Sequence, residues 1–153
     1  MVNQVNAEQT PKPVVTAKMP RPRPRHDVAK RLFLLFAALS GFLWVTLGAL
    51  AGHGLFNAGQ HADFFDKAHR YQIVHTLALL ALVSLPPSWP LLLRRTAGFL
   101  WILGLFAFCG SLYWMAFTAT PDLRLVVPVG GIAFLLGWAM LFFAACWGER
   151  HGR

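Results

Sequence analysis

Six polar residues that could bind a ligand or carry out chemistry fall near the ends of long apolar stretches. Tyr71, Gln72 and His75 come first, because residues three and four apart can share one face of a helix. Histidine is the most versatile of these residue types, since imidazole binds metals and transfers protons near neutral pH. The candidate cluster as a whole comprises His53, Tyr71, Gln72, His75, Ser111 and Tyr113.

Three interpretations compete for this cluster. In the structural one, a buried His75 satisfies its N–H with a hydrogen bond between helices, to Ser111, Tyr113 or a backbone carbonyl. In the second, His53 and His75 ligate a haem iron. In the third, the segment between the first two apolar stretches binds a metal ion, although it lacks an HxxxH spacing. We call this segment the first outer loop, and its candidate ligands are His53, His61, Asp63, Asp66 and His69. We prefer the structural interpretation and expect no metal or other cofactor.

Long uncharged stretches must position these residues. The chain is 56% hydrophobic and only 13% charged, and residues 32–52, 96–118 and 125–148 contain no Asp, Glu, Lys or Arg. A helix needs about 20 such residues to cross the hydrocarbon core of a bilayer. These three stretches therefore predict transmembrane helices, the first of them uncleaved rather than a signal peptide ending near residue 51.

A fourth apolar stretch, residues 71–85, is shorter and ends at Pro86. It either extends backwards, with Lys67 and Arg70 reaching out of the membrane, or is re-entrant. Basic residues favour a full crossing, because four crossings place the basic N-terminal segment and Arg94 and Arg95 on one side. That side is the cytoplasm under the positive-inside rule.

We therefore predict an all-α integral membrane bundle of four transmembrane helices, at about residues 31–52, 67–86, 95–118 and 125–147 of a domain spanning 29–148. Residues 1–28, which are basic and rich in proline, are predicted to be a disordered cytoplasmic tail, and residues 149–153 a short cytoplasmic one. The net charge of +8 is concentrated in that first tail without any nucleic-acid-binding motif. The expected partner is the lipid bilayer, not a nucleic acid.

This topology gathers the polar and glycine-rich segments in the outer half of the bundle. The glycines predict close helix packing, because small residues let helices in lipid approach each other. We expect a compact bundle packed through Gly48, Gly52, Gly110, Gly130, Gly131 and Gly137.

Four motifs resemble those of a family of small membrane proteins. The segment LGALAGHGL at 47–55 is similar to its GAxxAHGL signature, and YQIVHTL at 71–77 to its YQxxHAL segment. The segment GSLY at 110–113 resembles SGSLY, and PVGG at 128–131 with Gly137-Trp138 resembles PxGGxxxxxGW. On these motifs the chain is identified as a member of the domain-of-unknown-function 423 family, the YgdD-like inner-membrane proteins, related to transmembrane protein 256.

The resemblance covers residues 32–147 and departs at Cys109 and Gly52, where the family usually has serine and alanine. It implies a four-helix inner-membrane protein without an established biochemical activity.

The preferred functional interpretation is a non-enzymatic accessory, assembly or envelope factor of the bacterial inner (plasma) membrane, multi-pass with both termini cytoplasmic. Its partners would be lipid, another membrane protein or a second copy of the chain. The alternative is a protein that binds or conducts a small molecule, metal or haem through the outer polar pocket. An enzyme is least favoured, because no set of nucleophile, base and orienting group is recognisable.

Overall fold

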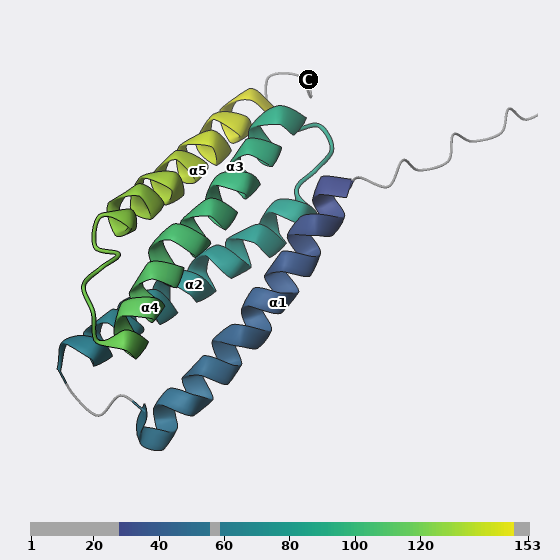
Figure 1. Ribbon diagram of the computed structural model, residues 1–153. Coiled ribbons are helices and arrows are strands. Elements are labelled where there is room, and N and C mark those ends of the chain that lie inside the picture. The colour runs from purple at the N-terminus through teal and green to yellow at the C-terminus, as the bar shows by residue number, and fades with distance from the viewer. Residues whose placement is uncertain (1–27, 56–58, 149–153) are drawn as a thin grey trace, which may run out of the picture.

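The computed structural model describes residues 28–55 and 59–148, and these residues form helices joined by short turns (Figure 1). The predicted tails lie outside the described residues, except for Val28, which begins the first helix. Residues 91–118 form one continuous helical segment, and the middle part of this segment is a π-helix. The elements are α1 (Val28–Leu50), η1 (Ala51–Leu55), α2 (Gln60–Ser84), α3 (Leu91–Gly104), η2 (Leu105–Gly110), α4 (Ser111–Thr118) and α5 (Val126–Gly148).

Three helical segments are long and apolar enough to cross a membrane, at Val28–His53, Leu91–Thr118 and Val126–Trp147. The second helix, α2, is not one of them, although it has 25 residues. Its first half carries the charged residues Asp63, Asp66, Lys67 and Arg70. The described part of the chain is thus all-helical, with four long helical segments that include three clear candidate spans.

Three helices begin earlier than the sequence predicted, and α1 does so by three residues, at Val28 instead of residue 31. The start of α2 is Gln60 instead of residue 67, because Phe65 and Ala68 are buried against the other helices and extend its packed face. The start of α3 is Leu91 instead of residue 95, directly after Pro90, which places Arg94 inside the helix. Proline commonly marks the beginning of a helix, since it lacks the N–H that a helix interior requires.

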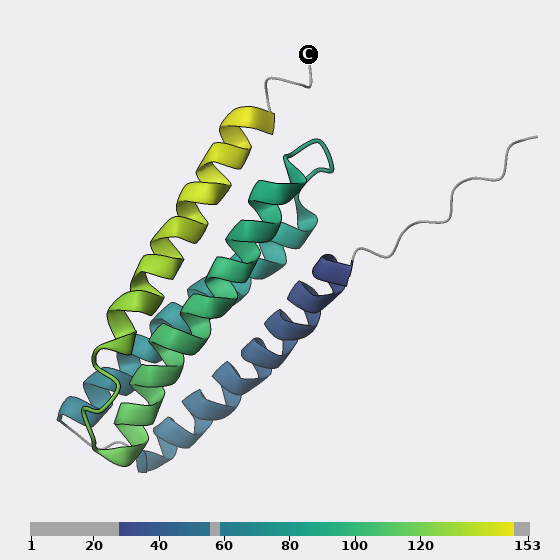
Figure 2. The same ribbon diagram turned by 45° about the horizontal axis from the view of Figure 1, so that its top comes forward.

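The helices pack in chain order, with α1 and α5 at opposite edges (Figures 1 and 2). The α1 helix packs against α2, α2 packs against the continuous segment α3–η2–α4, and α5 packs against α3 and η2. Within the described residues the backbones of α1 and α5 do not approach each other, nor do those of α2 and α5. The four helical segments therefore form a bundle in which α2 and α5 meet through side chains alone, at His75, Phe134 and Trp138.

The tightest helix contact joins α5 to α3 and η2. A methyl group at Gly130 would overlap the backbone nitrogen of Phe108, and one at Gly137 would lie 2.5 Å from the Trp101 ring. Trp101 is itself completely buried. The other predicted packing glycines are less constrained: a methyl group would meet only ordinary contacts at Gly110 and Gly131, and open space at Gly52.

Candidate functional site

A chain of hydrogen bonds links α1, α2 and α4. The Tyr113 hydroxyl donates to Oε1 of Gln72 at 2.6 Å, so Nδ1 of His69, 3.2 Å from the Tyr113 oxygen, acts as a donor to it. Nε2 of Gln72 donates to the Ser40 carbonyl oxygen at 2.9 Å and lies 3.3 Å from Ser40 Oγ. That hydroxyl in turn lies 2.7 Å from Oγ1 of Thr76. We call these five residues the polar network.

The His69 end of the polar network is fixed between aromatic rings. The imidazole stacks on Trp44 with ring centroids 4.6 Å apart and on Phe65 with centroids 5.3 Å apart. Nε1 of Trp44 also donates to the His69 carbonyl oxygen at 3.0 Å. Gly48 leaves room for the ring, since a methyl group there would lie 3.1 Å from His69 Nε2. His69 is therefore positioned by packing as well as by its hydrogen bond.

His75 occupies a separate site between α2 and α5. Its Nδ1 lies 2.8 Å from the Tyr71 carbonyl oxygen, and Nε1 of Trp138 donates to its Nε2 at 3.2 Å. A carbonyl only accepts and an indole N–H only donates, so these bonds select the neutral imidazole with its hydrogen on Nδ1. The ring also stacks on Phe134, with centroids 3.5 Å apart. Both nitrogens are thus engaged, and a metal or haem iron would have to displace the Trp138 bond to reach Nε2.

The six residues of the predicted cluster do not meet at one site. Gln72 and Tyr113 belong to the polar network, whereas Tyr71 and His75 lie on another face of α2, with ring centroids 6.1 Å apart. Successive residues on a helix point about 100° apart, so Tyr71 and Gln72 face different neighbours. Ser111 is buried at the start of α4, and His53 is exposed in η1.

Three site residues escaped the sequence analysis: Ser40, Thr76 and Trp138. Ser40 is a hydroxyl in the middle of an uncharged stretch, and Thr76 follows Gln72 by four residues, so both carry a recognisable signal. The partner of His75 is Trp138, not Ser111 or Tyr113. Nothing in the sequence indicates that α5, and not α4, faces His75.

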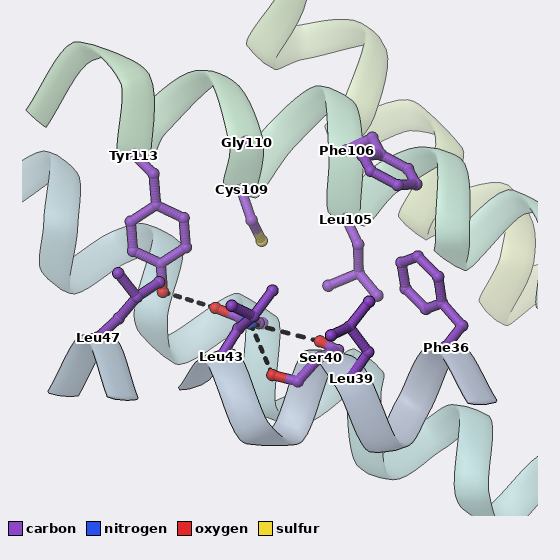
Figure 3. A pocket seen from close by; sticks show the side chains of 11 residues that line it. Phe36, Leu39, Ser40, Leu43, Leu47, Leu105, Phe106, Cys109, Gly110 and Tyr113 are labelled. Carbon is purple, nitrogen blue, oxygen red and sulfur yellow. Dashed lines mark hydrogen bonds between the residues drawn. The ribbon is translucent and has the colours of Figure 1, made fainter. Parts of the chain in front are cut away.

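A lateral groove of about 190 Å³ lies beside the polar network, between α1 and the segment η2–α4. Figure 3 shows Leu39 and Leu43 of α1 facing Leu105 and Phe106 of η2 across it, with the Cys109 side chain pointing into the space. Gln72 and Tyr113 form its polar side, but their polar atoms are bonded to each other and to Ser40. The groove therefore presents mainly hydrocarbon to whatever enters it.

The outer-loop residues do not assemble into a metal centre in the described part of the chain. Within residues 28–55 and 59–148, no three His, Cys, Asp or Glu side chains are close enough to hold an ion together. Asp66 lies 3.4 Å from Arg70 in an exposed ion pair, and His69 is engaged by the polar network. The metal and haem interpretations thus gain no supporting geometry.

We predict that His75→Ala lowers the free energy of unfolding by about 2 kcal/mol, because it removes a buried hydrogen bond and an aromatic stack. The measurement is thermal unfolding in detergent micelles. His53→Ala, which truncates an exposed histidine, is the matched control and should be nearly neutral. A His75→Ala protein as stable as the parent would contradict a structural role for this imidazole.

Comparison with known proteins identifies related sequences. Residues 47–131 match the sequence model of DUF423, a protein family of unknown function. A UPF0382 membrane protein of Haemophilus influenzae is 37% identical over 118 residues, covering 76% of this chain and 94% of the relative. The inner membrane protein YgdD of Escherichia coli is 36% identical over 128 residues, covering 82% and 97%. A UPF0382 membrane protein of Staphylococcus epidermidis is 32% identical over 122 residues, covering 74% and 94%. No solved structure matches the chain.

Proposed function

This chain belongs to the DUF423 family of membrane proteins, and from that premise we propose that it is a non-enzymatic accessory protein of the bacterial inner membrane. The observation that carries the proposal is the state of the polar groups at the candidate site. The polar network is bonded internally, His75 is bonded on both nitrogens, and the adjacent groove is walled by hydrocarbon. Because the polar groups are already bonded and the groove is apolar, this surface is suited to packing against an apolar molecule.

The proposal includes four crossings with both termini in the cytoplasm. At about 1.5 Å per residue, the 25 residues of α2 measure about 37 Å, which exceeds a hydrocarbon core of about 30 Å. The Lys67 and Arg70 side chains then extend back to the interface. Arg70 and Asp66, near its start, are mostly exposed, which suits an interfacial position. The basic residues Lys30, Arg31, Arg94 and Arg95 all lie at the end where α1 and α3 begin, which supports assigning that end to the cytoplasm.

A catalytic role would require a reactive group that is available to a substrate. A general acid or base must come within hydrogen-bond reach of the proton that it moves. His75 and Tyr113 already use all their polar side-chain atoms in protein contacts, and His69 uses its Nδ1. Breaking these bonds would leave buried partners unsatisfied, at a cost of about 1–3 kcal/mol each. This favours a structural network over a catalytic one.

The lateral groove suits a single hydrocarbon chain as its occupant. A volume of about 190 Å³ is too small for a helix, whose diameter with side chains is about 10 Å. Its walls are leucine and phenylalanine from two helices whose backbones are only loosely packed against each other. We therefore take the acyl chain of a membrane lipid as the molecule that the groove holds.

The test places the photo-reactive leucine analogue photo-leucine at position 43, which lines the groove. Position 45, exposed on α1 outside the groove, is the control. Irradiation follows purification in detergent, which removes loosely held lipid, and mass spectrometry of the intact protein counts lipid adducts. We expect adducts at position 43 in at least a roughly fivefold excess over position 45, since a lipid enclosed by two helices exchanges more slowly than one on an open surface. Equal labelling at the two positions would reject the groove as a binding surface.

A further inference from the structure

Cationic side chains surround a small pocket at the end of the molecule where α1 and α3 begin. Lys30 of α1 and Arg94 and Arg95 of α3 line it, together with Phe33, Leu82 and Val83. Figures 1 and 2 show the start of α1 beside the connection from α2 to α3. The pocket volume is about 40 Å³, whereas a cavity needs only about 10–15 Å³ to hold one water molecule. It is thus the size for one small polar group.

The charges at this end of the described chain are all positive. The described acidic residues are Asp63 and Asp66 in α2 and Asp122 between α4 and α5, and they lie at the opposite end. Arg70 at that opposite end is paired with Asp66. The pocket formed by Lys30 and Arg94 has no carboxylate among its lining residues. It is therefore complementary to an anion.

Backbone and side-chain donors add to this preference. The α3 helix begins after Pro90 without a side-chain cap, so the first N–H groups of the helix remain available near Leu91, which also lines the pocket. Such N–H groups and the helix dipole favour an anion. Arg94 is held in place by a bond of 3.2 Å from its Nη1 to the Leu85 carbonyl oxygen, while its buried Nε lacks a hydrogen-bond partner.

We propose that this pocket binds the phosphate of an anionic phospholipid, such as phosphatidylglycerol, in the leaflet where α1 and α3 begin. A lipid is favoured over a free phosphate because the rest of the pocket lining is apolar and can contact an acyl chain. This apolar lining includes Phe33, Leu82 and Val83. Basic pockets between transmembrane helices on the cytoplasmic side suit anionic lipid headgroups. The site is separate from the lateral groove, so the two proposals can fail independently.

The test measures lipid binding to the detergent-purified full chain by native mass spectrometry. Phosphatidylglycerol is the probe, phosphatidylethanolamine is the zwitterionic comparison, and inorganic phosphate is the competitor. The variant K30Q/R94Q is compared with R31Q/R124Q, which loses the same charge at two exposed residues outside the pocket. From the usual contribution of a basic residue near an anionic headgroup, K30Q/R94Q should weaken phosphatidylglycerol binding about 30-fold. The control should weaken binding by at most about fivefold, because neither residue lines the pocket and only Arg31 lies at the same end of the molecule.

A second variant protects the test against misfolding, since Arg94 also holds the turn after α2. K30Q alone removes an exposed side chain and should weaken binding about fivefold. Equal weakening by K30Q/R94Q and R31Q/R124Q would reject the pocket in favour of general charge. Binding of phosphatidylethanolamine as tight as that of phosphatidylglycerol, or displacement of the lipid by an equal concentration of inorganic phosphate, would also overturn the proposal.

Discussion

Gly130→Ala is expected to lower the free energy of unfolding by about 3 kcal/mol, or the midpoint of thermal unfolding by roughly 10 °C. The added methyl group would overlap the backbone nitrogen of Phe108 and would also lie 2.8 Å from the carbonyl carbon of Ala107. A side chain could rotate away from such a contact, but the backbone of a helix cannot. Relief therefore requires α5 to move away from η2, which would loosen the stack of Phe134 on His75.

The neighbouring glycine supplies a matched control for this prediction. A methyl group at Gly131 would lie 3.8 Å from the Phe108 ring, which is an ordinary contact. Both substitutions gain the same helix propensity, about 1 kcal/mol. The difference between their free energies of unfolding therefore measures the cost of the close contact between α5 and η2. Thermal unfolding in micelles measures both, and Gly131→Ala should be neutral or stabilising. Equal stability of the two variants would show that α5 does not pack this closely on the π-helix.

The helices could be predicted from sequence because charge is excluded from lipid. Residues 32–52, 96–118 and 125–148 are uncharged and coincide with most of α1, α3–η2–α4 and α5. The early start of α2 could not be seen in the same way, because it depends on tertiary burial. Phe65 and Ala68 are buried by neighbouring helices although charged residues surround them in sequence.

The candidate site was only partly predictable, for a geometric reason. Local spacing correctly suggests that residues near position 72 share a helix. Which of these residues meet at one site depends, however, on which neighbouring helix packs against each face of that helix. Gln72 and Thr76 face α1 and α4, whereas Tyr71 and His75 face α5 and η2. Only the order of packing separates these two sets, and the sequence does not encode that order locally. The π-helix η2, which lines both the groove and the α5 contact, also left no signal that we recognised.

The second large effect is expected at Gln72, the residue that connects the two halves of the polar network. Gln72→Leu removes the bonds to Tyr113 and to the Ser40 carbonyl while keeping a similar volume. Interhelical hydrogen bonds in membranes contribute up to about 1.7 kcal/mol each, so the loss should be about 2 kcal/mol. Thr46→Val is the control, since its exposed hydroxyl bonds only to the Phe42 carbonyl of its own helix; it should be nearly neutral.

A double-mutant cycle separates a network from a set of independent bonds. Tyr113→Phe removes one hydroxyl and should cost about 1.5 kcal/mol, because the Oε1 of Gln72 then lacks its donor and the Nδ1 of His69 its acceptor. In a Gln72→Leu background the Gln72 acceptor is already gone, so the same substitution should cost only the bond that Tyr113 accepts from His69. We expect the two single effects to exceed the double effect by about 1 kcal/mol, which unfolding in micelles can resolve. If the two single free-energy changes add up to that of the double variant, Tyr113 and Gln72 stabilise the protein independently. That result would contradict the polar network as a coupled unit.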